Sequence, residues 1–436
     1  MAGDADTIVA LATPAGIGGI GVVRLSGPRA VALAEAIAGG GIAPRRATHR
    51  RLRDGDGTLI DDGIVIRFPG PHSYTGEDVV ELQGHGSPVL LQQLVETARR
   101  LGARLARPGE FTERAYLNGR MDLAQAEAVA DLIHARTTAA ARLARNSLDG
   151  ALAREIEPVA AEIRELRVLI EAEIDFGETD LESAVAPEVA ARAAGLATAV
   201  EALRARLRPA RVYSTGMRLA LVGAPNVGKS SLMNRLADAE VAIVTDRPGT
   251  TRDLLRANIA IDGIPVELVD TAGMHDSDDE VERIGIERAR DAAAGADLVL
   301  EIRDMARPHA CAALPDLPGI PVLRVWNKAD LMPGVSVAEG LLVSAATGSG
   351  LDALRAAIRE QAGLADGAGE RFSVRTRHLE GLEGVAEALG RIQADQPPDL
   401  IAEDLRLAER ALDGLLGRGD HEALLGAIFA GFCIGK

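Results

Sequence analysis

Residues 223–230 read Gly-Ala-Pro-Asn-Val-Gly-Lys-Ser, which fits the pattern GxxxxGK[ST] in full. They follow an apolar stretch that begins at Arg218 and precede a helix-like run, residues 231–237. In a strand, loop and helix of this kind, backbone N–H groups converge on phosphate, Lys229 reaches the outer phosphates and the Ser230 hydroxyl ligates Mg²⁺. The sequence therefore predicts a loop that binds the phosphates of a nucleotide.

Two further segments are typical of the metal and γ-phosphate side of such a site. The stretch Gly-Thr-Thr-Arg-Asp offers two threonines, of which Thr251 is preferred, to complete the Mg²⁺ shell and sense the γ-phosphate. Residues 270–273, Asp-Thr-Ala-Gly, end an apolar stretch. This would place Asp270 near the metal and the Gly273 N–H near the γ-phosphate. We expect the Mg²⁺ ligands to be Ser230 and Thr251.

The base-reading elements come next along the chain. Residues 327–330, Asn-Lys-Ala-Asp, follow an apolar stretch, and the Asp330 carboxylate would accept both guanine N–H groups. Residues 344–346, Ser-Ala-Ala, would complete the base pocket. Four elements in this order predict a GTPase specific for guanine. The predicted GTP contacts are Asn226, Val227, Gly228, Lys229, Ser230, Ser231, Thr245, Asp246, Arg247, Pro248, Gly249, Thr250, Thr251, Asp270, Thr271, Ala272, Gly273, Asn327, Lys328, Ala329, Asp330, Ser344, Ala345 and Ala346.

The residue after Gly273 departs from the Ras-like pattern. Ras-like enzymes place a glutamine there to orient the attacking water, whereas this chain has Met274. A thioether cannot do this, so another group must orient the water. The acidic run that follows offers such groups, or it is only a solvated surface. The candidates are His275, Asp276, Asp278, Asp279, Glu280 and Glu282.

Lysine is rare in this arginine-rich chain and occurs only as Lys229, Lys328 and Lys436. The nucleotide site explains the first two, because a compact ammonium differs from a planar guanidinium. The third ends the sequence and either belongs to a second chemistry or simply closes the chain. Two cysteines, Cys311 and Cys433, are too few for a disulfide framework and fit a reducing cytoplasm.

The composition predicts a helix-rich protein of about two to four domains, because the chain has 436 residues. Hydrophobic residues make up 47% and aromatic residues only 2%, so the cores consist mainly of Ala, Val, Leu and Ile. The net charge of -16 disfavours nonspecific binding to DNA or anionic membranes. Without a basic N-terminal region or a long apolar run, we expect a cytoplasmic protein with no membrane segment.

The elements that must position these residues change in character along the chain. Short apolar stretches predict an N-terminal α+β domain with a helix at 88–101. Long Ala, Leu, Glu and Arg segments then predict helices, interrupted by an acidic loop at 175–188. Strands and helices alternate next, and the chain ends as helix. The predicted strands are 7–12, 19–25, 63–68, 218–223, 264–270, 297–302 and 320–326.

Helical sequence on both sides of an α/β region predicts that this region is an insertion. The fold class is therefore a multidomain α/β protein with an N-terminal α+β domain, a discontinuous helical domain and an inserted P-loop GTPase domain built on a parallel sheet. The predicted domains are 1–118, 119–212, 213–364 and 365–436.

Motifs outside the nucleotide site resemble a known family. They are Ser-Tyr-Thr-Gly-Glu-Asp-Val-Val-Glu at 73–81, His-Gly at 85–86, Pro-Gly-Glu-Phe-Thr at 108–112, Asn-Gly-Arg-Met-Asp-Leu-Ala-Gln-Ala-Glu at 118–127, the segment 279–288 and the terminal Phe-Cys-Ile-Gly-Lys. Over nearly the whole chain, these motifs resemble the tRNA uridine-modification GTPase family MnmE, also called TrmE.

The resemblance implies a homodimer that works with a flavoprotein, MnmG (GidA), which carries FAD, on the wobble uridine of certain tRNAs. The implied reaction adds a carboxymethylaminomethyl group at C5, with 5-formyl- or methylene-tetrahydrofolate supplying one carbon. The implied folate contacts are Arg24, Glu81, Arg120 and Lys436. A pterin edge suits a carboxylate, and a polyanionic tail suits arginine or lysine. Cys433 is either a small buried apolar residue or a functional thiol.

The resemblance also implies that potassium enters the nucleotide site in place of an arginine finger. Its ligands would be Asn226, Thr245, Arg247 and Thr250. The family pattern has Ile-Ala where this chain has Arg247 and Pro248; a backbone carbonyl can still ligate, but proline stiffens the loop. Among the acids after Met274, the resemblance selects Glu282 as the residue that positions the water.

Two other classes of GTPase are alternatives. The ending Cys-Ile-Gly-Lys has the outline of a prenylation box, but the glycine, the final lysine and the lack of a preceding polybasic stretch disfavour a prenylated regulatory GTPase. A ribosome-assembly GTPase would call for an RNA-binding module, and the sequence has no aromatic RNP signature or KH-like segment. Such a GTPase, without modification chemistry, stays the alternative function.

Overall fold

The computed structural model describes residues 6–176, 185–238, 255–270, 295–308, 319–364, 372–418 and 422–435. Two compact units make up the chain. The smaller unit combines residues 1–130 with 413–436, and the larger one comprises residues 131–412. The two ends of the sequence therefore belong to the same unit.

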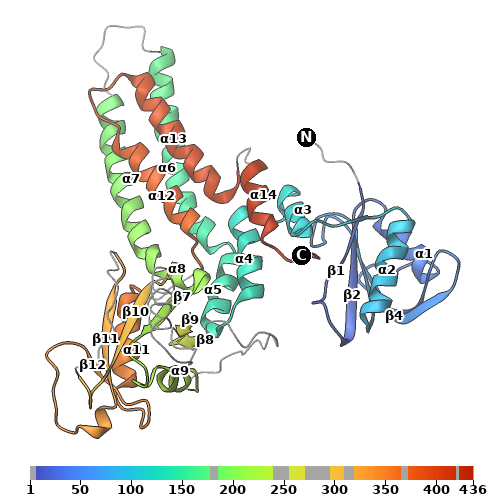
Figure 1. The fold of residues 1–436 in the computed structure, drawn as a ribbon. Helices are drawn as coiled ribbons and strands as arrows, with labels where there is room; N and C mark the ends of the chain where they lie inside the picture. Colours follow the sequence, from blue (N-terminus) through green and yellow to red (C-terminus); the bar gives the residue numbers. More distant parts are fainter. Residues whose placement is uncertain are drawn as a thin grey trace, which may run out of the picture. The chain divides into compact units, whose positions relative to one another are not determined.

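The smaller unit contains a sheet (Figure 1). Its six strands follow the order β3-β4-β5-β2-β1-β6. Its neighbouring strands are antiparallel except for the parallel pair β1 and β6. Its strands are β1 (Ile8–Leu11), β2 (Gly18–Ser26), β3 (Thr48–Arg53), β4 (Leu59–Phe68), β5 (Val79–Gly86) and β6 (Arg104–Leu105).

Helices α1 (Ala30–Ala38) and α2 (Pro88–Arg100) cover one face of this sheet, and their apolar side chains join those of the strands in one core. Along β5, Val80 and Leu82 are buried while Glu81 and Gln83 are partly exposed. This alternation puts polar side chains on the other face. The unit also contains α3 (Glu110–Leu117) and α14 (Glu422–Ala430).

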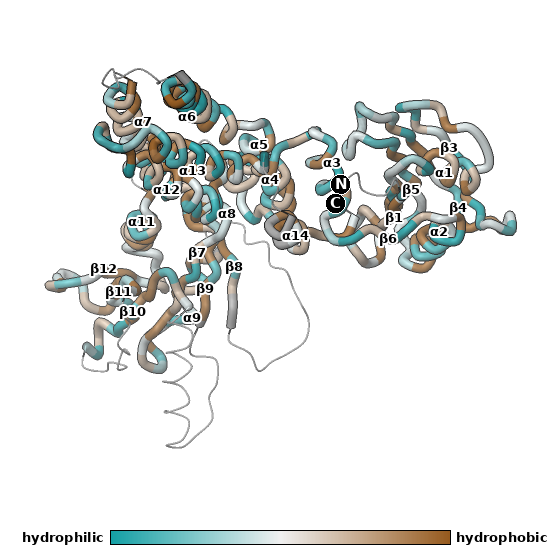
Figure 2. Tube along the Cα trace, turned by 90° about the horizontal axis from the view of Figure 1, so that it is seen from above, coloured by the Kyte–Doolittle hydropathy of each residue, from teal (hydrophilic) through white to brown (hydrophobic). Residues whose placement is uncertain are grey.

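The larger unit contains a bundle of long helices (Figure 1). Figure 2 shows hydrophobic and hydrophilic residues alternating along α6 and α7, as expected for helices that bury one face. The helices are α4 (Leu123–His134) and α13 (Pro398–Leu416), which both run into the smaller unit, α5 (Thr138–Leu148), α6 (Ala151–Phe176), α7 (Val185–Leu207), η1 (Arg208–Ala210), α8 (Arg211–Thr215) and α12 (Thr376–Gly390).

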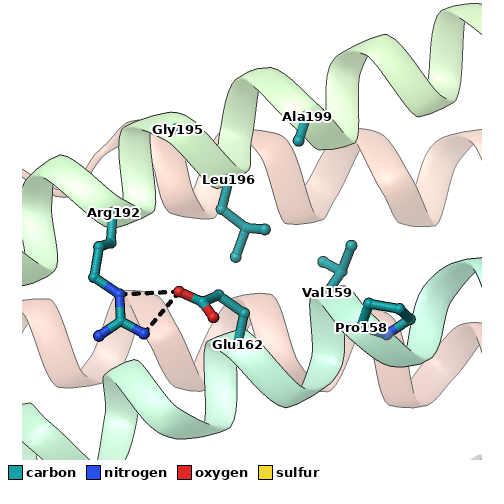
Figure 3. A pocket seen from close by; sticks show the side chains of 7 residues that line it. All are labelled: Pro158, Val159, Glu162, Arg192, Gly195, Leu196 and Ala199. Carbon is teal, nitrogen blue, oxygen red and sulfur yellow. Dashed lines mark hydrogen bonds and ion pairs between the residues drawn. The ribbon is translucent and has the colours of Figure 1, made fainter.

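A shallow pocket lies between α6 and α7 (Figure 3). Pro158, Val159 and Leu196 give it apolar walls, and Arg192 pairs with Glu162 at 2.8 Å across it. Further along the bundle, Arg406 of α13 pairs with Glu171 of α6 at 3.1 Å. Ion pairs thus join helices whose small alanine-rich cores contain few aromatic side chains.

A second six-stranded sheet in the larger unit has the order β12-β11-β10-β7-β9-β8. All neighbouring pairs are parallel except β8 and β9, which form an antiparallel hairpin. Its strands are β7 (Met217–Val222), β8 (Leu255–Ile261), β9 (Ile264–Asp270), β10 (Leu298–Asp304), β11 (Val322–Asn327) and β12 (Leu341–Leu342), and its helices are α9 (Lys229–Asp238), η2 (Ala329–Leu331) and α11 (Leu351–Gln361).

The fold class predicted from the sequence is confirmed: an N-terminal α+β domain, helices on both sides of an α/β region, and the α/β region inserted between α8 and α12. The acidic loop expected at 175–188 is shorter than predicted, because α7 already begins at Val185. Pro187 lies in its first turn, where proline is tolerated. The predicted domain boundaries stay predictions.

Candidate functional site

The phosphate loop joins β7 to α9, as its sequence predicted. Asn226 and Gly228 both have positive φ, 62° and 95°. A side chain at Gly228 would collide with the Asn327 amide, so the loop requires glycine there. Lys229 begins α9, is 5% exposed, and donates from Nζ to the carbonyls of Gly223 at 2.6 Å and Ala224 at 3.0 Å. Its ammonium therefore lies within the curve of the loop.

Asn327 joins the phosphate loop to the segment that was predicted to complete the base pocket. Its Nδ2 donates to the Val227 carbonyl at 2.9 Å, and its Oδ1 accepts the Ala345 N–H at 3.0 Å. Asn327 is 2% exposed, so both ends of a buried amide are paired with backbone. Asn327, the first residue of the Asn-Lys-Ala-Asp segment, thus links two loops through hydrogen bonds.

The exposed Asp330 is held by the same base-pocket segment. Ser344 Oγ donates to Asp330 Oδ1 at 2.5 Å and accepts the Thr347 N–H at 3.1 Å. These bonds orient the carboxylate before any base binds. Ala329 and Ala346 lie in the same two loops. The structure therefore brings together the predicted residues of the phosphate loop and of the base pocket.

Lys328 connects the base-reading segment to a residue that the sequence interpretation missed. Its Nζ donates to the Asn226 carbonyl at 2.9 Å and to Asp304 Oδ2 at 2.7 Å. Asp304 is the last residue of β10. The only signal for Asp304 in the sequence was its position at the end of a strand, because it belongs to no motif.

Several predicted residues cannot be placed. Asp270 ends β9, but its side chain lies outside the described residues. Also outside them are Cys311, Met274, His275, the acids 276–282 with Glu282, Thr245, Asp246, Arg247, Pro248, Gly249, Thr250, Thr251, Thr271, Ala272, Gly273 and Lys436. Their assigned contacts with GTP, Mg²⁺, K⁺ and folate stay predictions.

A second cluster lies in the smaller unit, on the polar face of its sheet. Arg24 of β2 donates to Glu81 Oε1 of β5 from Nε at 3.1 Å and from a terminal nitrogen at 2.9 Å. Its other terminal nitrogen donates to the Gly435 carbonyl at 3.3 Å. The guanidinium carbon also lies 5.7 Å from the ring centroids of Tyr74 and of Phe111. Rings and carboxylate together hold this cation in one orientation.

The second oxygen of Glu81 also has a partner, because Gln83 Nε2 donates to Oε2 at 3.2 Å. Gln83 is a residue that the sequence interpretation missed, although its i+2 spacing from Glu81 on a strand was a signal. Arg120 is exposed, and its Cγ would lie 3.3 Å from a Cβ atom at Gly76. No hydrogen bond among the described residues joins Arg120 to Arg24 or Glu81.

The Pro-Gly-Glu-Phe-Thr motif anchors the end of the chain in the smaller unit. The Gly109 N–H donates to the Cys433 carbonyl at 3.3 Å. A Cβ atom at Gly109 would lie 2.8 Å from the Phe429 carbonyl oxygen, so only glycine allows this approach. Phe429 packs on Phe432 with ring centroids 5.4 Å apart. The Cys433 thiol is free and exposed, which does not fit a buried apolar role.

Glu110, in the same motif, is the centre of a charged cluster. Its side chain is 2% exposed and pairs with Arg104 at 2.6 Å and Arg114 at 3.2 Å. The Arg107 N–H donates to Oε2 at 2.6 Å. Burial raises the pKa of Glu110, but the hydrogen bonds from Arg104, Arg107 and Arg114 outweigh burial and bring it below the usual 4.5. Glu110 therefore has a structural role in the smaller unit.

The phosphate loop, the base-reading segment and the mainly parallel sheet that positions them define a P-loop GTPase, here with an N-terminal α+β domain and a split helical domain. A family model for the "GTP-binding protein TrmE N-terminus" matches residues 7–120, and one for the "MnmE helical domain" matches residues 123–433. The chain belongs to the MnmE (TrmE) family of tRNA modification GTPases.

Full-length relatives agree with this assignment. A protein of Xanthomonas campestris pv. campestris (strain 8004) is 48% identical over 442 residues, which cover 99% of each chain. One of Alkalilimnicola ehrlichii is 47% identical over 441 residues, again 99% of each. Both are named tRNA modification GTPase MnmE.

Among solved structures, the G domain of the T. maritima FeoB iron transporter covers 34% of this chain and 98% of its own, with 24% identity and a TM-score of 0.26.

In the parts of the chain that the structure describes, no helix has the length and apolar character needed to cross a membrane.

Proposed function

We propose that this chain couples GTP hydrolysis to addition of a carboxymethylaminomethyl group at C5 of the wobble uridine of certain tRNAs, with a folate as the one-carbon donor. The observation that carries the proposal is the Arg24 cluster. Arg24 binds both Glu81 and the Gly435 carbonyl, so the residues before Lys436 lie against two of the implied folate contacts. This cluster lies in the smaller unit, whereas the phosphate loop and the base pocket belong to the larger one.

The residues of this cluster suit a reduced folate. A pterin ring offers adjacent donors along one edge, and Glu81 presents a carboxylate whose two oxygens are oriented by Arg24 and Gln83. Arg120 and Lys436 would supply positive charge to the glutamate tail. The bound folate would supply a one-carbon unit, and 5-formyl- and methylene-tetrahydrofolate are the two candidate forms.

On the nucleotide side, Ser230 and Thr251 would hold Mg²⁺, and Asn226, Thr245, Arg247 and Thr250 would hold K⁺. Glu282 would position the attacking water, because Met274 cannot. We propose that the protein acts in the cytoplasm as a homodimer, with tRNA and the FAD-carrying flavoprotein MnmG as partners.

Mass spectrometry of wobble nucleosides tests this proposal. In tRNA from a strain that lacks the protein, the carboxymethylaminomethyl nucleoside should be absent, and the wild-type chain should restore it. A chain with Cys433→Ser should hydrolyse GTP normally but restore less of the nucleoside, because this thiol is exposed in the smaller unit. Unchanged nucleosides in the deletion strain would favour the ribosome-assembly or regulatory alternative. An equal loss of hydrolysis and modification in Cys433→Ser would contradict the proposal that the two reactions use separate sites.

A further inference from the structure

Asp304 is a buried carboxylate beside the guanine-reading segment. It ends β10, lies opposite Asn327 of β11 in the parallel register, and its side chain is 8% exposed. Its Oδ2 accepts Lys328 Nζ at 2.7 Å, and its Oδ1 accepts the Ala306 N–H at 2.9 Å. Burial raises the pKa of Asp304, but the bonds from Lys328 and Ala306 outweigh burial and lower it below 3.8. The carboxylate is therefore charged at neutral pH.

The Lys328 ammonium joins this carboxylate to the phosphate loop through the Asn226 carbonyl, at 2.9 Å. Asn226 and Lys328 have φ values of 62° and 64°, although neither is glycine. Left-handed backbone at residues with a Cβ atom is sparsely populated and persists only where surrounding contacts hold it. Lys328 Nζ is one such contact, because it links the two left-handed residues to the sheet.

We propose that Asp304 is a positioning residue of the GTP site: its carboxylate fixes the Lys328 ammonium against the Asn226 carbonyl and so sets the conformation of the phosphate loop. A lysine side chain alone has many rotamers to lose. A second, rigidly held acceptor at the end of a sheet strand selects the rotamer that reaches Asn226. Asp304 acts through Lys328 and does not itself need to touch the nucleotide.

The test is Asp304→Asn in the full chain. The amide keeps an oxygen for the Ala306 N–H but turns an NH₂ donor toward Lys328, so the charge and the acceptor are lost while the turn is kept. Losing one hydrogen bond to a charged group corresponds to about a ten- to hundredfold change in affinity. We expect a fluorescent GDP analogue to bind about ten- to hundredfold more weakly, chiefly through faster dissociation. Wild-type affinity would overturn the proposal.

A double-mutant cycle separates positioning from a structural role. Lys328→Met keeps the aliphatic stem and removes the ammonium. In that background Asp304→Asn should cause no further loss of affinity. A second loss of the same size would mean that Asp304 acts through the Ala306 turn, and the proposal would be wrong.

The matched control is Asp297→Asn. Asp297 directly precedes β10, at the opposite end of the strand from Asp304, and accepts the Arg218 N–H at 2.8 Å. The Asp297→Asn variant should bind the GDP analogue with the affinity of the wild type. Thermal unfolding without nucleotide checks that each variant is folded. If Asp304→Asn is not, Asp304→Ser replaces it, because a serine hydroxyl can still accept the Ala306 N–H. At least a tenfold loss of affinity that disappears in the Lys328→Met background supports the proposal, and wild-type affinity overturns it.

Discussion

At the scale of single residues, polar side chains of the nucleotide site are fixed by hydrogen bonds within the protein. Asn327 binds the Val227 carbonyl and the Ala345 N–H, and Ser344 orients Asp330. The motifs predicted these residues, because each motif is contiguous in sequence. They did not predict the partners: Asn327 and Val227 are 100 positions apart, and Asp304 belongs to no motif. The described residues of the phosphate loop and the base pocket lie together, while the bonds that fix them required the structure.

Glu282→Ala tests the proposed water-positioning role at this scale. The change leaves the phosphate loop and the base-reading segment intact, so GTP binding should be retained. Turnover should fall by about 10²- to 10⁴-fold, the range for loss of a positioned acid or base. Phosphate release at saturating GTP measures this, alongside binding of a fluorescent analogue. Asp352→Ala on α11, where the side chain is fully exposed, is the control and should keep normal turnover. Normal turnover in Glu282→Ala would assign the role to another acid of the run.

At the scale of elements, helix α3 is placed by charge as well as by its buried apolar residues Phe111 and Ala115. It has eight residues and begins at Glu110, directly after Gly109, whose backbone is left-handed. The Glu110 carboxylate pairs with Arg104, which precedes the helix, and with Arg114, which lies within it. A negative charge in a first turn also interacts favourably with the helix dipole. A helix this short is marginal by itself, so its existence depends on these tertiary contacts.

Glu110→Gln should therefore destabilise the protein at pH 7, by about 3 kcal/mol, as expected when one partner of a buried ion pair is removed. The folded pKa of Glu110 is lowered, so its contribution is complete above the usual value of 4.5 and is lost as pH falls through the folded pKa. The difference between variant and wild type should accordingly narrow below about pH 4.5. Denaturant unfolding across pH measures it.

Glu96→Gln is the control for this experiment, because Glu96 forms an exposed pair with Arg99 on α2. Exposed pairs contribute about 0–1 kcal/mol, so this variant should unfold nearly like the wild type. A Glu110→Gln difference that stays constant from pH 7 to below pH 4 would show that the carboxylate charge is not what places α3.

Elements with a strong local signal were predicted well, and those built by distant contacts were not. Strand β9 spans Ile264–Asp270 as predicted, and α2 ends one residue earlier than expected. Strand β8 was missed because Arg256 and Asn258 interrupt its apolar residues. Its pairing with β9 stabilises it as a strand. Helix α3 was missed because eight residues give little periodicity. Helix α1 was missed although its alanine-rich sequence and following glycines were a signal.

At the scale of the whole molecule, the two proposed chemistries belong to different compact units. The larger unit carries the phosphate loop and the base pocket, and the smaller one carries the Arg24 cluster. The sequence predicted this division through its motifs, although only the resemblance connected the second cluster with folate. The helices α4 and α13 contribute residues to both units.

Potassium dependence tests the proposed activation of the assembled protein. If K⁺ replaces an arginine finger, GTP hydrolysis should be at least about tenfold faster in KCl than in NaCl at equal ionic strength. Asn226→Ala should remove this difference. Phosphate release in the two salts is the measurement, and equal rates in the wild type would exclude a potassium site from the mechanism.

The contact between Arg24 and Gly435 also bears on how the chain is made. These residues are 411 positions apart, so the sheet of the smaller unit leaves the ribosome long before the segment that completes its polar cluster. Until residues 433–435 have been made, the Arg24 guanidinium lacks the Gly435 carbonyl and the Gly109 N–H lacks the Cys433 carbonyl. A nascent chain can thus carry a folded GTP-binding domain while the second site is unfinished. If the Arg24 cluster is the proposed folate site, an incomplete chain lacks that site whatever the state of its GTP-binding domain.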